Sequence, residues 1–190
     1  MAIRNHLFAP EEYYHCFNRG TDKRDIFMDA QDYIYFLKSL RAYNSTRVLG
    51  KLRLHDKDDK DEPLVSIVTY NLLPNHYHIV LREEVEGGIS KYLQRVGGGY
   101  TMYFNNKNER SGALFQGVFK SKHLTTDQDL RQVIAYVYKN HIIHNISDPE
   151  KYRSSLNTNL DIVRGFASNL SDDKLLEIAE IIKLSRLDLE

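Results

Sequence analysis

The chain has 190 residues, of which 42% are hydrophobic and 27% charged, and its 26 basic side chains balance 26 acidic ones. This composition is ordinary for one globular domain, and the balanced charge argues against a protein that coats nucleic acid without selectivity. No apolar stretch approaches the roughly 18 residues that a membrane span needs, and none near the N-terminus resembles a signal peptide. Since the single cysteine, Cys16, cannot form an internal disulfide, we expect a cytoplasmic protein.

Charge is nevertheless uneven along the chain. Residues 91–122 contain six basic side chains and one acid, whereas residues 56–62 contain five acids and two lysines. Two interpretations remain open. The charged stretches are either solvated surface, or the basic middle region faces a polyanion.

The first third of the chain predicts a strand, a helix and a long loop. An aromatic run indicates a strand over residues 13–18. Asp29 can cap a helix over residues 30–43, where apolar side chains recur at helical spacing. The charged stretch 44–63 has neither period and predicts an irregular excursion.

The middle of the chain predicts a hairpin followed by a second helix. β-branched residues indicate a buried strand over residues 64–72, and a turn then leads into a strand over residues 76–82. A helix follows over residues 89–105. Its three consecutive glycines, residues 97–99, each cost a helix about 1 kcal/mol relative to alanine, so they indicate either a kink or a point of close approach.

The last third predicts a strand over residues 113–124 and a helix over residues 126–144. Thr126 and Asp129 have the spacing of a capping box at the start of this helix. A core stripe is expected on one side of it, from the following apolar positions: Leu130, Val133, Ile134, Val137 and Tyr138. Residues 146–190 predict a linker and a C-terminal amphipathic helix.

This order of elements predicts an α+β fold. Four strands interleaved with two helices most economically form a ferredoxin-like (split βαβ) four-stranded antiparallel sheet with two helices on one face. The strand over residues 76–82 would be central. Either nucleic acid or the added helix after Thr126 would cover the open face of the sheet.

Two histidines on the central strand are candidate metal ligands. His76 and His78 are two residues apart, so both side chains point to the same face of the sheet. Two neutral imidazoles can bind one divalent metal if a third ligand is supplied from elsewhere. The alternative is a pair of half-buried polar side chains without a ligand.

A tyrosine and an asparagine on the last predicted helix could complete such a site. Tyr136 and Asn140 are four residues apart and therefore neighbours on a line beside the core stripe. A metal held by His76, His78 and Asn140, with Tyr136 next to it, is one interpretation. An aromatic side chain filling a groove beside a surface asparagine is the other.

Several runs of residues carry a resemblance to a known family. PNHYHIV at 74–80, followed about sixty residues later by YVYKN at 136–140, resembles the single-tyrosine HUH transposases of bacterial insertion sequences, where U is a hydrophobic residue. Three more runs resemble the branch called REP-associated tyrosine transposases: NRG at 18–20, GYTMYFN at 99–105 and LFQGVFKS at 114–121. The resemblance spans residues 13–144, which implies a transposase domain over residues 1–145.

The resemblance implies a metal-dependent strand transferase that cleaves and rejoins single-stranded DNA near hairpins, acting as a homodimer. Tyr136 would attack a backbone phosphate and form a 5′-phosphotyrosine link, while His76, His78 and Asn140 would hold Mg²⁺ or Mn²⁺. A phenol has a pKa near ~10 and is mostly protonated at neutral pH, so a metal that polarises the phosphate would help the attack.

Other residues could contribute to binding or compete for these roles. Four cations are candidate phosphate contacts, with solvated surface as the alternative: Arg19, Arg95, Lys120 and Lys122. Three further tyrosines are rival nucleophiles, which their spacing assigns to the core: Tyr100, Tyr103 and Tyr138. Two other functions fit the same residues. One is a noncatalytic single-strand nucleic-acid module that stacks bases on Tyr77 and the first strand, and the other is a small metal hydrolase that uses water.

Overall fold

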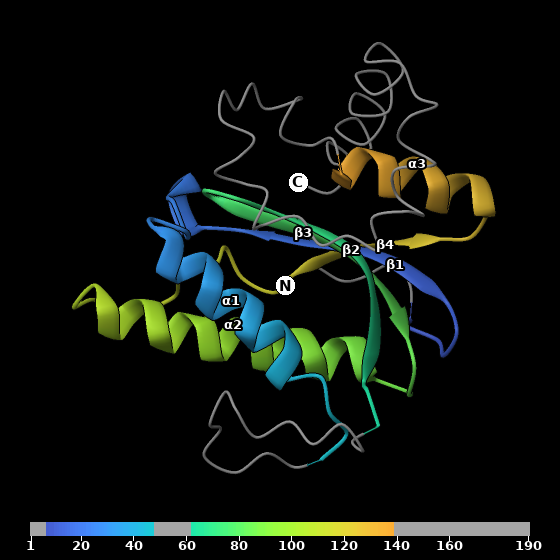
Figure 1. The fold of residues 1–190 in the computed structure, drawn as a ribbon, viewed down its shortest axis with the longest axis horizontal. Helices are drawn as coiled ribbons and strands as arrows, with labels where there is room; N and C mark the ends of the chain where they lie inside the picture. The colour runs from blue at the N-terminus through green and yellow to red at the C-terminus, as the bar shows by residue number, and fades with distance from the viewer. Residues whose placement is uncertain (1–6, 48–61, 139–190) are drawn as a thin grey trace.

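The computed structural model describes residues 7–47 and 62–138, which form one four-stranded antiparallel sheet with helices on both faces (Figure 1). The strands are β1 (Tyr13–Arg19), β2 (Val65–Leu73), β3 (His76–Glu83) and β4 (Lys120–Leu124). Their order is β2-β3-β1-β4, with every neighbouring pair antiparallel. The ferredoxin-like α+β prediction is therefore confirmed, and β3 is central as expected.

The helices divide between the two faces of this sheet. Helices α1 (Ala30–Ala42) and α2 (Gly88–Lys107) lie side by side on one face, and α3 (Asp127–Tyr138) lies on the other (Figure 1). A single turn of 3-10 helix, Thr21–Lys23, follows β1. Of the two covers considered for the open face, the added helix is the one present.

Side-chain caps explain where the helices begin. The Asp29 carboxylate accepts the backbone N–H groups of Gln31 and Asp32 at the start of α1, as predicted. At α3, the Thr126 hydroxyl accepts the backbone N–H of Asp129 at 3.0 Å and donates to its carboxylate at 2.8 Å, which confirms the capping box.

The main core lies between the sheet and the α1–α2 layer, and it is rich in aromatic rings. The largest completely buried side chains include four tyrosines and one phenylalanine: Tyr14, Tyr77, Tyr92, Tyr100 and Phe36. Two of these hydroxyls donate to backbone carbonyls within the core. Tyr92 donates to the carbonyl of Leu40 and Tyr100 to that of Ile26, so the polar ends of these two rings are satisfied.

The triple glycine marks a close approach between the two helices. α2 continues through residues 97–99 without interruption. A Cβ on Gly99 would overlap the ring of Tyr43, which is 8% exposed, whereas a Cβ on Gly97 or Gly98 would meet nothing within 4 Å. Close approach, one of the two interpretations of the glycines, is therefore present at Gly99.

The predicted strand over residues 113–124 is wrong in its first half, because β4 begins only at Lys120. Residues 113–119 are irregular and make one isolated bridge, between Phe115 and Gly20. Gly117 has a φ of +107°, which a continuous strand does not allow. The apolar residues Leu114, Phe115 and Phe119 are buried in the main core, although the backbone that carries them is not paired as a strand.

Some predictions fall outside the described residues. These are most of the 44–63 excursion, the helix beyond Tyr138, Asn140, and the linker and terminal helix of residues 146–190. Among the helices that the structure describes, none is long and apolar enough to cross a membrane.

Candidate active site

Helix α3 is held against the sheet by a second, smaller apolar cluster and one buried hydrogen bond. The cluster consists of Val80, Leu124, Val133, Tyr136 and Val137. The side-chain amide of Asn71, on β2, donates to the carbonyl of Val137 at 2.9 Å, and Asn71 is 1% exposed. Tyr136 therefore belongs to the face of α3 that packs on the sheet. The sequence pattern predicted that it would lie beside this face, and that prediction is wrong.

The two histidines of β3 lie on the same face of the sheet, and His78 contacts this helix. His76 lies opposite Arg19 and His78 lies opposite Phe17 in the register of β1 with β3, so all four side chains share one face of the sheet. The ring centroids of His76 and His78 are 5.1 Å apart. His78 is completely buried, and His76 is half-buried.

Tyr136 lies against His78. Their ring centroids are 5.6 Å apart and nearly perpendicular, at 85°. The structure thus brings Tyr136 of α3 into contact with His78 of β3, although the two residues are far apart in the sequence. Tyr136 is only 3% exposed, so a reaction of its hydroxyl with DNA requires that side chains around it move aside.

A third histidine, His15, completes the group and was missed in the sequence. It lies on β1, is 1% exposed, and its Nε2 is 2.9 Å from Nδ1 of His78. Its ring centroid is also 6.2 Å from that of Tyr136. The alternation along β1 could have placed His15 on the same face as Phe17, but only the register between β1 and β3 places it next to His78.

The donor nitrogens of the β3 histidines suit a divalent metal. Nδ1 of His76 is 2.6 Å from the side-chain oxygen of Asn75, and Nδ1 of His78 is the atom that contacts His15. In each ring the contact engages Nδ1, and metal-binding histidines commonly coordinate through one ring nitrogen while the other makes a hydrogen bond. Within residues 7–47 and 62–138, no group of three His, Cys, Asp or Glu side chains could hold a metal ion. The third predicted ligand, Asn140, lies outside these ranges.

Three of the four predicted DNA contacts border the histidines. Lys120 and Lys122, on the edge strand β4, lie opposite Phe17 and His15 and are exposed. Arg19 is exposed opposite His76 and donates to the side-chain oxygen of Gln116 at 3.2 Å. These cations can attract a phosphate backbone toward the face that carries His76.

The fourth, Arg95, is not brought together with them. It lies on α2, on the opposite face of the sheet. Its guanidinium donates to the carbonyl of Ser45 at 2.6 Å and to that of Arg47 at 2.9 Å. This arrangement ties the segment after α1 to α2.

Two of the rival tyrosines, Tyr100 and Tyr103, lie on α2, on the face of the sheet opposite to the histidines. Tyr100 is buried in the main core, where burial raises the pKa of its phenol well above the ordinary value. Tyr103 stacks on Tyr35 with ring centroids 3.7 Å apart, and its hydroxyl is 3.2 Å from an Asp32 carboxylate oxygen. The side chain of Tyr138 lies outside the described part of the chain. Of the named tyrosines with described side chains, only Tyr136 contacts a β3 histidine.

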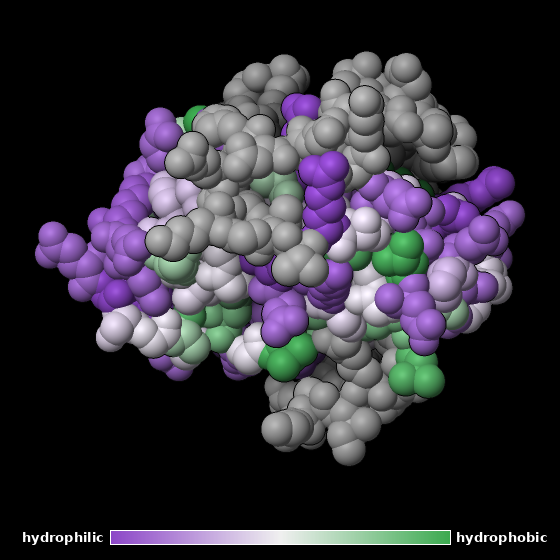
Figure 2. Space-filling model, turned by 90° about the horizontal axis from the view of Figure 1, so that it is seen from below, coloured by the Kyte–Doolittle hydropathy of each residue, from purple (hydrophilic) through white to green (hydrophobic). Residues whose placement is uncertain are grey.

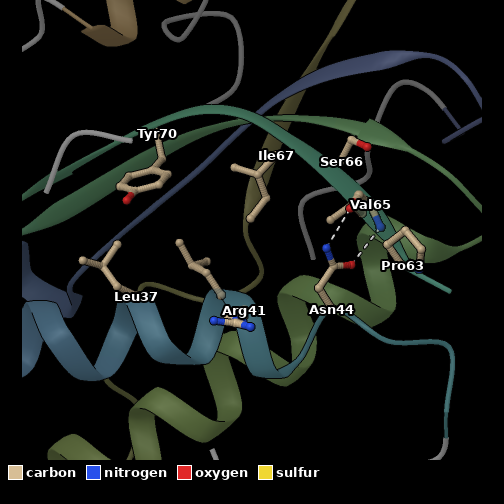
Figure 3. Close-up of a pocket in the computed structure, with 9 residues that line it drawn as sticks. Leu37, Arg41, Asn44, Pro63, Val65, Ser66, Ile67 and Tyr70 are labelled. Carbon is tan, nitrogen blue, oxygen red and sulfur yellow. Dashed lines mark hydrogen bonds between the residues drawn. The ribbon is translucent and has the colours of Figure 1, made fainter. Parts of the chain in front are cut away.

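A separate groove lies between α1 and the edge strand β2 (Figure 3). Its volume is about 490 Å³, and it is lined by Leu37, Leu40, Arg41, Asn44, Pro63, Val65, Ser66, Ile67 and Tyr70. The Asn44 side chain bridges the backbone of Leu64 and Val65 at one end and so joins α1 to β2. The groove contains none of the predicted site residues.

The outer side of α1 and α2 is largely hydrophilic, with small, scattered hydrophobic areas (Figure 2). Met28 and Met102, at 64% and 62% exposed, are the most exposed apolar side chains of these helices and the turn before them. Isolated exposed apolar residues are normal on a protein surface. The side of the sheet that carries α3 therefore remains the candidate site.

Comparison with known proteins supports the fold. No family model and no curated protein matches the sequence. A solved structure described as the REP-associated tyrosine transposase bound to a REP hairpin superposes with a TM-score of 0.61. The match covers 87% of this chain and 88% of that one, at 14% sequence identity. At this identity the similarity establishes a shared fold.

Proposed function

We propose that the chain is a metal-dependent strand transferase that cleaves and rejoins single-stranded DNA near hairpins through a 5′-phosphotyrosine intermediate. The contact between Tyr136 and His78, with ring centroids 5.6 Å apart, is the observation that carries this proposal. It pairs a nucleophile with a metal-ligating side chain. The sequence motifs at 74–80 and 136–140, and the fold shared with a transposase that was solved with a REP hairpin, support the same chemistry.

In the proposed reaction, the hydroxyl oxygen of Tyr136 attacks a phosphorus of the DNA backbone. A bond forms between that oxygen and phosphorus, and the bond from phosphorus to the 3′ oxygen breaks. One proton leaves the phenol and one joins the departing 3′ oxygen. Because the phosphodiester bond type is retained, a 3′ hydroxyl can reverse the step and join strands without ATP.

His76 and His78 would hold Mg²⁺ or Mn²⁺ through their Nε2 atoms, with Asn140 as the proposed third ligand. When bound, the ion would polarise the scissile phosphate and stabilise the charge that develops on it. The chain itself orients the imidazoles, since Asn75 and His15 engage their Nδ1 atoms. The apolar cluster around Tyr136 keeps bulk water away from the phenol.

Exposed cations beside the histidines would position the DNA. Lys120, Lys122 and Arg19 lie on or next to the face that carries His76, and a single strand running along β4 would meet all three. The predicted homodimer is tested by the mass of the protein in solution, with and without hairpin DNA.

The test is the formation of a covalent adduct. The purified protein is incubated with a panel of labelled hairpin-forming single strands in Mg²⁺ or Mn²⁺, then denatured and separated by electrophoresis. We expect a denaturation-resistant complex that Tyr136→Phe does not form. Tyr103→Phe, which removes a hydroxyl on the opposite face of the sheet, is the matched control and should form it normally.

The outcomes separate this function from its alternatives. If wild type and Tyr136→Phe form the adduct equally, the proposal fails. Cleaved product without an adduct would indicate a hydrolase that uses water, and DNA binding without metal or cleavage would indicate a binding module. The binding module was expected to stack bases on Tyr77. The structure does not support this, because the Tyr77 ring is 2% exposed and belongs to the core between the sheet and α1–α2.

A further inference from the structure

His15 and His78 form a buried pair across β1 and β3. The hydrogen-bonded nitrogens are 2.9 Å apart, and the rings are stacked with centroids 5.0 Å apart at an angle of 23°. Both side chains are almost completely buried, at 1% and 0% exposed. Water does not readily replace a hydrogen bond at this depth, so the bond restricts how the His78 ring can turn.

The direction of this hydrogen bond decides which nitrogen of His78 can bind a metal. A neutral imidazole has one N–H donor and one acceptor nitrogen. If Nδ1 of His78 donates to Nε2 of His15, the lone pair of His78 lies on Nε2. If His15 donates instead, Nε2 of His78 carries the proton and cannot coordinate.

For His76, the hydrogen-bond partner determines which nitrogen carries the proton. The side-chain oxygen of Asn75 can only accept a hydrogen bond, so the contact of 2.6 Å requires that Nδ1 of His76 donates. The lone pair of His76 is therefore on Nε2. For both β3 histidines to bind one ion in the same way, His78 must also donate from Nδ1, and His15 is the group placed to accept.

We propose that His15 is a positioning residue, which accepts a hydrogen bond from Nδ1 of His78 and thereby presents Nε2 of His78 to the metal. The inference rests on the proposed function, which makes His76 and His78 ligands. Carboxylates and backbone carbonyls usually serve as the second partner of a metal-binding histidine. In this chain an imidazole from the adjacent strand takes that part.

The first test reads the tautomer directly in the metal-free protein. Two-bond correlation of imidazole hydrogens with nitrogens, in uniformly ¹⁵N-labelled full-length protein at neutral pH, identifies the protonated nitrogen of each histidine. We expect His78 to carry its proton on its own Nδ1, and His15 likewise to be protonated on its own Nδ1. A proton on Nε2 of His78 would overturn the inference.

The second test measures Mn²⁺ affinity by electron paramagnetic resonance in wild type and three variants. His15→Phe keeps the size of the ring and removes the acceptor, and it should weaken Mn²⁺ binding by about 10- to 100-fold. His15→Gln places an acceptor oxygen near the position of Nε2 and should recover most of that loss. Cys16→Ala, a buried change on the same strand that belongs to the main core, should leave the affinity unchanged.

The outcomes distinguish this inference from the proposed function. Equal Mn²⁺ affinity in wild type and His15→Phe, or equal weakening by the Phe and Gln variants, would overturn the role of His15 even if wild type forms the DNA adduct. If no DNA adduct forms but the tautomer and the Mn²⁺ series behave as expected, the strand-transfer proposal fails and the positioning role of His15 stands.

Discussion

Asn71 is expected to control how firmly α3 rests on the sheet. Its side-chain amide donates to the carbonyl of Val137 at 2.9 Å, and Asn71 is 1% exposed. In Asn71→Ala the carbonyl loses this donor at a buried position, which typically costs about 1–3 kcal/mol. The docked position of α3, and with it the contact between Tyr136 and His78, should become roughly 5- to 150-fold less favoured.

Native-state hydrogen exchange measures this effect locally. In Asn71→Ala the backbone amides of α3 should exchange faster by that factor, while amides of the central strands β1 and β3 should change much less. Asn18→Ala is the matched control. It removes a bond of the same type, from the Asn18 amide to the Gly117 carbonyl at 3.0 Å, but at an exposed position where water can take over. Unchanged exchange in α3, or the same acceleration in the control, would refute the reasoning.

Two further predictions concern stability and DNA binding. In chemical denaturation, Gly98→Ala should raise the free energy of unfolding by up to about 1 kcal/mol, because its Cβ meets open space. Gly99→Ala should be about 1–3 kcal/mol less stable than Gly98→Ala, because its Cβ would overlap the buried ring of Tyr43. Equal stabilities would contradict the close approach of the helices. Lys120→Ala combined with Lys122→Ala should weaken single-stranded DNA binding and reduce the slope of log affinity against log salt by about 1.4, as expected for two lost phosphate contacts. Lys38→Ala, at an exposed position of α1, is the control, and an equal loss there would contradict a DNA path along β4.

The order of the elements could be predicted because each signal is local. The caps at Asp29 and Thr126 are set by residues two or three positions away, and strand and helix periods are read within one segment. The false strand before Lys120 shows where this fails. Phe115 and Phe119 have the even spacing that would place them on one face of a strand, but they fill the core from an irregular segment that turns at Gly117.

The site could be predicted only in part, because its geometry depends on contacts between distant segments. The spacing of His76 and His78 on one strand face is local and was expected. The pairing of His15 with His78 depends on the register of β1 with β3, and the burial of Tyr136 depends on the rotation of α3 on the sheet. A helical stripe read from the sequence does not determine that rotation when apolar residues occur on several sides of the helix.

Mapping the site of covalent attachment tests the central claim most directly. The adduct formed with hairpin DNA is trapped, the DNA is trimmed with nuclease, and the protein is digested and sequenced by mass spectrometry. If the phenol attacks a backbone phosphate, the peptide that contains Tyr136 should carry a residual nucleotide. The phosphate of that nucleotide should be bonded to the phenol oxygen of Tyr136. A nucleotide on any other residue, or cleaved DNA with no modified peptide, would contradict the proposed role of Tyr136.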